Sequence, residues 1–190
     1  MSLNGLLKIV GLKASINKGL KENIKAAFLN AIPVQRPLVK RLPNLDPYWL
    51  AGFITGGSSG CFFVNVFKAT TNTGFAVSLV FKITQHSYDA ELIKSFIPFF
   101  NSGLLIRRIW GALRSNKDYC DFLVTTLSDN YDKKIPFLKK YKVEGVKADD
   151  FADFCKIAEI VRAKGHLTPE GGLSGEILKL KDGMNSKRLI

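Results

Sequence analysis

The sequence contains few cysteines and histidines, the residues that form disulfides and bind zinc. Its 190 residues include three cysteines, Cys61, Cys120 and Cys155, and two histidines, His86 and His166, which lie 80 positions apart. An odd, widely spaced set of cysteines predicts neither a disulfide framework nor a cysteine-rich zinc site. Two histidines so far apart do not form a ligand motif, so we expect no metal centre built on them.

Long apolar runs and acidic residues are also scarce. No apolar run approaches the roughly 20 residues that a membrane-spanning helix needs. The chain has 28 Lys and Arg against 16 Asp and Glu, a net charge of +12, while 46% of its residues are hydrophobic. That hydrophobic content is enough for the core of one ordinary domain and excludes disorder as the main state. A folded, strongly basic chain favours a polyanionic partner, with nucleic acid ahead of an anionic membrane surface.

The first quarter of the chain is the most basic. Residues 1–46 hold eight basic and two acidic residues, which is half of the net charge of +12. Apolar residues at helical spacing predict one helix over residues 5–29. Four prolines between positions 31 and 47 predict an extended tether, because proline lacks an amide donor and restricts its predecessor. Lys40 and Arg41 of this tether could lie along phosphates; a solvated linker is the alternative. We therefore divide the chain into a basic N-terminal helix with linker, 1–46, and a single domain, 47–190.

The rest of the chain predicts an α/β (α+β) domain. Asp46 could cap a helix over residues 47–56, with Pro47 in its first turn. Alternating segments 61–70 and 74–85 predict one hairpin, and segments 103–110 and 118–127 predict a second. Helical patterns follow at 87–100, with Ser87 as cap, and at 149–165. The order helix–hairpin–helix–hairpin–helix predicts a four-stranded antiparallel sheet backed by helices.

A short pattern occurs near both ends of the chain. Residues 9–17 read IVGLKASIN and residues 177–185 read ILKLKDGMN, 168 positions apart. A chance match in a chain rich in leucine and lysine is one explanation. The other is that the same element closes each of two repeats, of which this chain contains the second together with the last helix of the first.

The segment WLAGFITGGSSGCFFVNV, residues 49–66, resembles the signature motif of the LAGLIDADG homing endonucleases, particularly the fungal mitochondrial two-repeat kind. The resemblance continues through LVFKITQHSYDAELI, DFLVTTLSDNYDKKIPF and GVKADDFADFCKIAEIV to ILKLK near the C-terminus, in family order and spacing. It implies that the motif helix crosses a second such helix. Leu50, Gly52 and Gly56 are the interface candidates, since small residues let two backbones approach closely. Packing of the glycines against the chain's own sheet is the alternative.

The expected catalytic acid is missing from this motif. The resemblance implies a carboxylate near the end of each motif helix, and a pair of them would hold the divalent ions for phosphodiester hydrolysis. The corresponding stretch here, residues 54–60, reads ITGGSSG, and neutral hydroxyls hold magnesium far less well than carboxylates. We therefore assign no catalytic residue and no metal ligand, and expect magnesium only if endonuclease activity survives. Lys147 is either a lysine at the edge of the active site or an ordinary surface lysine.

Strand alternation separates a core face from an open face of the predicted sheet. The core face takes Phe62, Val64, Val66, Val77, Leu79, Phe81, Ile83, Cys120, Phe122 and Val124. The open face, which the resemblance implies would lie on the DNA major groove, has many apolar residues and few of the donors used to recognise bases. Phe63, Phe67 and Tyr119 are therefore candidates for stacking on unpaired bases. The candidate nucleic-acid contacts are Lys40, Arg41, Asn65, Lys68, Lys82, Arg107, Arg108, Arg114 and Lys117.

Three functions remain open at this point. The first is a catalytically inactive LAGLIDADG derivative that binds structured RNA in mitochondria, as a ribosomal component or an intron-splicing (maturase-like) factor. The missing acid and the apolar open face favour it. The second is a homing endonuclease half that acts on double-stranded DNA, as a homodimer or with a second chain at the motif helix. The third is a protein-interaction module. Nucleic acid is the expected partner, with RNA ahead of DNA, and no membrane span is expected.

Overall fold

The chain folds as two compact units, Met1–Leu38 and Val39–Ile190. The computed structural model describes residues 2–16, 19–35, 37–57, 61–71, 73–109, 118–168 and 175–185. The division falls before the boundary expected after Asp46, because residues 39–46 pack in the second unit. There the Leu42 amide donates to Ser95 Oγ at 2.8 Å and Leu45 is buried. Within the described ranges, no helix has both the length and the apolar character of a membrane span.

The first unit contains two short helices, α1 (Leu3–Ser15) and α2 (Glu22–Ala27). The prediction of one continuous helix over residues 5–29 is therefore wrong. Helix α1 ends at Ser15 because the backbone of Ile16 is extended, with φ −104° and ψ 133°, and further on Gly19 has a φ of +70°, a left-handed conformation that glycine adopts easily. Apolar spacing does not reveal such a break, because it registers side chains and not backbone angles.

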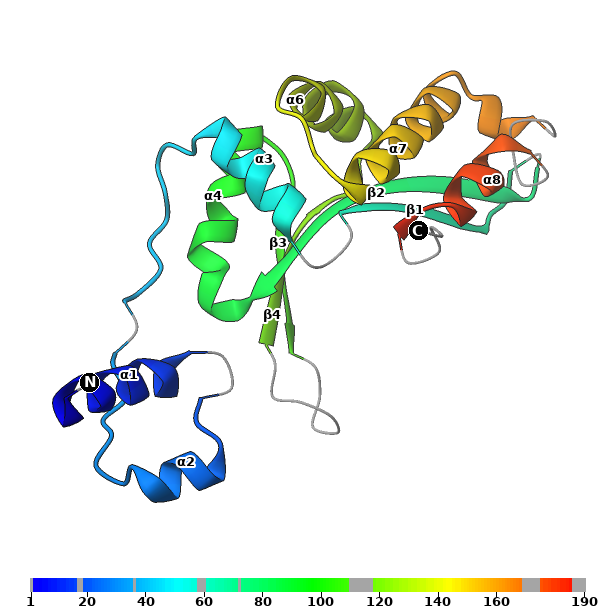
Figure 1. Ribbon diagram of the computed structural model, residues 1–190. Helices are drawn as coiled ribbons and strands as arrows, with labels where there is room; N and C mark the ends of the chain where they lie inside the picture. Colours follow the sequence, from blue (N-terminus) through cyan, green and yellow to red (C-terminus); the bar gives the residue numbers. More distant parts are fainter. Residues whose placement is uncertain are drawn as a thin grey trace. The chain divides into compact units, whose positions relative to one another are not determined.

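The second unit contains a four-stranded antiparallel sheet, as predicted from the two hairpins. Its strands are β1 (Phe62–Lys68), β2 (Phe75–His86), β3 (Leu104–Ile109) and β4 (Asp118–Val124), in the spatial order β1-β2-β4-β3. The outer strand of each hairpin therefore forms an edge, and β2 pairs with β4 in the middle. Figure 1 shows α6 and α7 lying along one side of the long strand β2.

The helices of this unit follow the predicted order, with several short turns added. They are α3 (Pro47–Gly56), η1 (Ser87–Asp89), α4 (Ala90–Phe100), α5 (Leu127–Asp129), η2 (Asn130–Lys134), α6 (Ile135–Lys140), α7 (Val146–Arg162), η3 (Gly165–Leu167) and α8 (Glu176–Asp182). Ser87 is not the predicted helix cap: it lies inside the 3₁₀ turn η1. The cap of that turn is His86, whose Nδ1 accepts a hydrogen bond from the Tyr88 amide at 3.3 Å.

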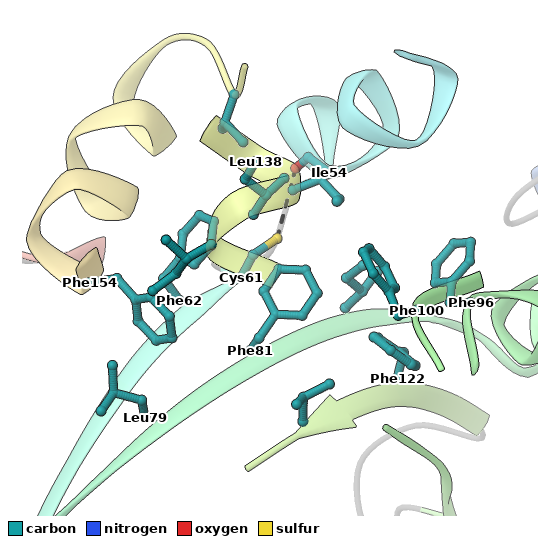
Figure 2. Packing of buried hydrophobic residues seen from close by; sticks show 14 of the residues in the cluster. Ile54, Cys61, Phe62, Leu79, Phe81, Phe96, Phe100, Phe122, Leu138 and Phe154 are labelled. Carbon is teal, nitrogen blue, oxygen red and sulfur yellow. Dashed lines mark hydrogen bonds between the residues drawn. The ribbon is translucent and has the colours of Figure 1, made fainter. Parts of the chain in front are cut away.

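The predicted core face of the sheet is confirmed. Phe62, Phe81 and Phe122 are fully buried, and the remaining predicted positions are buried or half-buried. Helices α4 and α7 contribute Phe96 and Phe154, whose ring centroids lie 5.8 Å from that of Phe122 and 5.4 Å from that of Phe62, respectively. Figure 2 shows these rings meeting over one face of the sheet. Burial of large aromatic side chains attaches the helices to this face.

The C-terminal part of the short repeated pattern also packs on the sheet. In α8, Ile177 is buried in the core, and Met184 just beyond the helix is buried as well. Asn185 follows, and its Nδ2 donates to the Phe62 carbonyl at 3.0 Å while its amide donates to Asp150 Oδ1 at 3.0 Å. In the first unit the positions equivalent to Ile177 and Met184 are exposed: Ile9 of α1 is 54% accessible, and Ile16, directly after this helix, is 46% accessible.

Candidate nucleic-acid interface

The motif helix α3 begins as the sequence predicts. Asp46 Oδ1 accepts a hydrogen bond from the Trp49 amide at 2.7 Å, and Pro47 occupies the first turn. Leu50 and Ile54, one turn apart, are fully buried in the core. The interface role expected for Leu50 is therefore wrong, because this side chain anchors α3 to its own domain.

Gly52 and Gly56 lie on the opposite, exposed face of α3. A Cβ atom placed on either glycine would meet no heavy atom of the described residues within 4 Å. Packing of these glycines against the chain's own sheet is thereby excluded. Trp49 lies on the same side, 42% exposed, with its ring stacked on Phe53 at 5.1 Å. The face has the small residues that a close approach of another backbone requires.

The C-terminal end of α3 is held by a lysine from α7. Lys147 Nζ donates to the Ile54 carbonyl at 2.7 Å and also to the Gly57 carbonyl. A cation at this end of a helix interacts favourably with the helix dipole and satisfies carbonyls that have no partner inside the helix. The structure therefore places Lys147 at the tip of the motif helix, where it is half-buried, and not on an ordinary surface position.

Two further groups meet at the same tip. The Thr55 hydroxyl donates to the Ala51 carbonyl at 2.9 Å and accepts from the Glu144 amide at 3.4 Å. The Cys61 thiol lies 3.8 Å from the Ile54 carbonyl, the contact drawn as a dashed line in Figure 2. Burial raises the pKa of the Cys61 thiol, although the nearby ammonium groups of Lys147 and Lys82 act in the opposite direction. The thiol is thus kept neutral.

The residues present at this tip do not fit a magnesium ion. Neither α3 nor Gly57 carries a carboxylate, and the sequence has none at Ser58, Ser59 or Gly60, which lie outside the described residues. The described parts of the chain hold no cluster of three or more His, Cys, Asp or Glu side chains. The ammonium of Lys147 already binds the carbonyl oxygens that point out of the helix end. Magnesium prefers carboxylate oxygens in octahedral geometry, which this set does not supply.

The face of the sheet opposite the core is open in the described part of the second unit. Asn65 and Phe67 of β1 are exposed there, and Phe63 is half-buried. The Lys82 ammonium of β2 lies 4.5 Å from the centre of the Phe63 ring, a cation–π contact. Of the predicted stacking residues, Phe67 is thus accessible on the open face, whereas the ring of Phe63 faces a cation of its own chain.

A polar network crosses the middle of this open face. Asp121 of β4 is 2% exposed, and its Oδ1 accepts from the Thr84 hydroxyl at 2.5 Å. Its Oδ2 accepts from Arg108 Nε at 2.6 Å and from Arg108 Nη2. The sequence predicted Arg108 as a contact but missed its partners. Thr84 and Ile106 flank Asp121 in the register only because β4 lies between β2 and β3.

The remaining candidate residues are spread over the second unit. Lys40 and Arg41 are exposed in the segment before α3, and Tyr119 is half-buried with its ring 6.3 Å from that of His86. The register places Lys68 and Arg107 on the core side of the sheet, each exposed near a strand end. Arg114 and Lys117 lie outside the described residues. Of the predicted nucleic-acid contacts that the structure describes on the sheet, Asn65, Lys82 and Arg108 lie on the open face, where Tyr119 is the register partner of Arg108.

The chain belongs to the LAGLIDADG family: the family model described as LAGLIDADG endonuclease matches residues 50–158. It is 35% identical over 193 aligned positions to "Probable intron-encoded endonuclease 2" of Neurospora crassa and 32% identical over 173 to "Probable intron-encoded endonuclease 3" of the same fungus. These matches cover 96% and 90% of the chain but 39% and 31% of the two relatives.

Solved structures give the same family. The I-SmaMI LAGLIDADG homing endonuclease bound to cleaved DNA is 43% identical, with a TM-score of 0.83 over 99% of this chain and 60% of that protein. The I-LtrWI LAGLIDADG homing endonuclease bound to target DNA is 42% identical with a TM-score of 0.83, again over 99% and 60%. The chain thus spans about three fifths of these enzymes. Both of these enzymes are bound to DNA, and the RNA-binding, ribosomal and splicing roles that were expected first from the sequence find no support in these similarities.

Proposed function

We propose that this chain is the DNA-binding repeat of a LAGLIDADG homing endonuclease, with the open face of its sheet in the major groove of double-stranded DNA. The observation that carries the proposal is the uncovered sheet face with Lys82, Arg108 and Asn65, in a chain that matches DNA-bound enzymes over nearly its whole length. Basic groups on such a face supply the salt-dependent attraction to phosphates, and amide and guanidinium groups contact base edges. This is the interpretation that the sequence analysis ranked second.

The motif tip defines what this repeat contributes to strand cleavage. Because Ile54, Thr55 and Gly57 carry no carboxylate and Lys147 neutralises the helix end, the described residues at this tip supply no carboxylate for magnesium. We therefore expect the chain alone to bind DNA without cutting it. Any cleavage would depend on metal-binding carboxylates from a second repeat.

The proposed partner is a second LAGLIDADG repeat, on the same polypeptide or on another chain. Two surfaces support it. The exposed glycine face of α3 allows close approach of another helix. Ile9 and Leu12 of α1 and Ile16 directly after it are about half exposed, although their equivalents in the repeated pattern, Ile177, Leu180 and Met184, pack into the core. We expect the α1 residues to pack on the sheet of the second repeat in the same way.

The cellular location belongs to the same proposal. The relatives in Neurospora crassa are named as intron-encoded, and the motifs resemble the fungal mitochondrial kind of this family. We propose that the chain acts in mitochondria on DNA that carries an intron insertion site.

Binding to matched nucleic acids tests the proposal. The full chain is titrated with double-stranded DNA, single-stranded RNA and an RNA hairpin over a range of salt concentrations. Double-stranded DNA should bind most tightly, and Lys82→Glu should flatten the dependence of log K on log salt by about one. The control Lys139→Glu changes the net charge equally but lies on α6, on the core side of the sheet, and should leave the slope unchanged. Tighter binding of RNA, or equal effects of the two variants, would refute the proposal.

A further inference from the structure

Asp121 is a charged side chain buried on the open face of the sheet. The residue is only 2% exposed, although the helices of the second unit that Figure 1 shows beside the sheet, α6 and α7, pack on the opposite, core face. It lies on the central strand β4, directly opposite Thr84 of β2 and Ile106 of β3 in the register. A carboxylate in such a position costs free energy unless it is paired and hydrogen-bonded. Both carboxylate oxygens of Asp121 do accept hydrogen bonds.

The carboxylate holds Arg108 in one orientation. Asp121 Oδ2 accepts from Nε and Nη2 of Arg108, and Oδ1 is itself fixed by the Thr84 hydroxyl. The Arg108 side chain is 43% exposed, and no other partner of it lies among the described residues. A guanidinium carries five N–H donors in a rigid plane. Two of them point to Asp121, so the edge formed by Nη1 and the second hydrogen of Nη2 remains available to a ligand.

Lys82, the other cation on this face, is suited to a different task. Its ammonium lies over the Phe63 ring at 4.5 Å, where the attraction has no directional pattern of donors. A compact ammonium acts as a point charge, which phosphates attract regardless of sequence. Arg108, by contrast, offers two parallel N–H groups from a fixed plane. That arrangement matches the O6 and N7 acceptors of guanine in the major groove.

We infer that Arg108 determines the base preference of this repeat by donating two hydrogen bonds to one guanine, and that Asp121 and Thr84 are positioning residues for it. The inference rests on the proposed function, since it needs the open face to lie in the major groove. Because the guanidinium is already oriented in the free protein, its side chain loses less conformational entropy when DNA binds. A purely structural cross-strand ion pair would stabilise the sheet equally well but would select no base.

Selection from a randomised double-stranded DNA library tests the inference. The full chain is used as it is, with Arg108→Lys, Asp121→Asn and the control Arg162→Lys. Arg108→Lys keeps a positive charge beside Asp121 but loses the planar fork. Arg162 belongs to α7 and lies over the Tyr131 ring, away from the open face. Arg162→Lys also replaces a guanidinium by an ammonium, so it is a matched control for Arg108→Lys.

The wild-type chain and Arg162→Lys should select a guanine at one position with equal strength. Arg108→Lys should lose that preference at this position alone and bind the selected site about tenfold more weakly. Asp121→Asn should weaken the same preference, while binding to unselected DNA should be unchanged or stronger, because the substitution removes a negative charge from this face. If Arg108→Lys instead weakens binding to all sequences equally, Arg108 contacts phosphate and the inference fails while the proposed function stands. If the wild-type chain retains no double-stranded DNA, the proposed function fails first.

Discussion

The ammonium of Lys147 lies 2.7 Å from the carbonyl oxygen of Ile54, and the two residues are 93 positions apart in the chain. The contact joins the start of α7 to the end of the motif helix α3. Lys147 also donates to the Gly57 carbonyl, so one cation satisfies two carbonyls that have no partner within the helix.

Replacement of this lysine should destabilise the second unit. Lys147→Met keeps much of the side chain's length but removes the charged donor, which should lower the free energy of unfolding by about 2 kcal/mol. Urea denaturation followed by circular dichroism measures the change. The control Lys142→Met replaces an exposed lysine five positions earlier and should change stability by less than about 0.5 kcal/mol. If Lys147→Met and Lys142→Met changed the free energy of unfolding equally, the contacts of Lys147 at the helix end would contribute nothing to stability.

The exposed glycines of α3 give a second prediction, in which stability and assembly change in opposite directions. Gly52→Ala meets no steric obstacle among the residues that the structure describes and should raise the free energy of unfolding by up to about 1 kcal/mol, since alanine favours a helix. In a complex with a second LAGLIDADG repeat the added methyl group should weaken association. Thermal unfolding of the isolated chain and co-purification with the second repeat measure the two effects.

Gly103→Ala is the matched control for this substitution. Gly103 has a φ of +91°, and a Cβ there would lie 2.5 Å from a ring carbon of Phe122, so this variant should be strongly destabilised. A destabilised Gly52→Ala would show that the chain itself needs the glycine. A stabilised variant that still assembles normally would exclude this face as the interface.

The helical period of α3 could have shown from the sequence alone that Leu50 lies on a different face of the helix from Gly52. Positions two apart on an α-helix point about 160° away from each other, so Leu50 cannot share a face with Gly52. Alternation along the strands did identify the core face, because a buried face imposes its period of two on Phe62, Phe81 and Phe122. The sheet and the order of its hairpins were therefore predictable.

Contacts between distant segments were not predictable in this way. The position of Lys147 at the tip of α3 depends on how α7 packs, and the network around Asp121 depends on β4 lying between β2 and β3. Periodicity assigns a face to each residue but gives neither the order of strands in a sheet nor the partner across it. The break after Ser15 was missed for a related reason, since the backbone angles of Ile16 and Gly19 have no signature in hydrophobic spacing.

The three cysteines should be poorly reactive in the folded chain. Cys61 and Cys120 are buried, and burial raises the pKa of the Cys120 thiol to about 11. Cys155 is partly accessible, but burial raises its pKa to about 11 as well, from 9.0. Because the thiolate is the nucleophile, alkylation of Cys155 by iodoacetamide at about pH 8 should be about 100-fold slower than in denaturant. Mass spectrometry of timed samples measures the rates, and rapid labelling of the native chain would contradict the prediction.

Lys134 is buried on the core side of the sheet and should make stability depend on pH. The residue is 1% exposed, with its Nζ 4.4 Å from the centre of the Phe100 ring and hydrogen-bonded to Ser102 Oγ. Burial lowers its pKa to about 8, from 10.5, although Asp129 opposes the shift. The charged form of Lys134 is thus disfavoured in the folded state. Below about pH 8 the lysine is protonated in the folded and the unfolded chain, so its burial lowers the free energy of unfolding by the full amount.

Raising the pH should therefore relieve this penalty. Between about pH 8 and pH 10.5 the unfolded chain binds more protons at Lys134 than the folded chain, so its contribution to the free energy of unfolding rises with pH. The thiols of Cys120 and Cys155 act in the opposite direction, since their raised pKa values favour unfolding above about pH 9. The comparison with Lys134→Met isolates the lysine. Urea denaturation at each pH gives the free energy of unfolding of the wild type and of Lys134→Met. From about pH 7 to pH 9.5 the difference between the two should change by about 2 kcal/mol in favour of the wild type. A difference independent of pH would show that Lys134 titrates normally and that its burial carries no electrostatic cost.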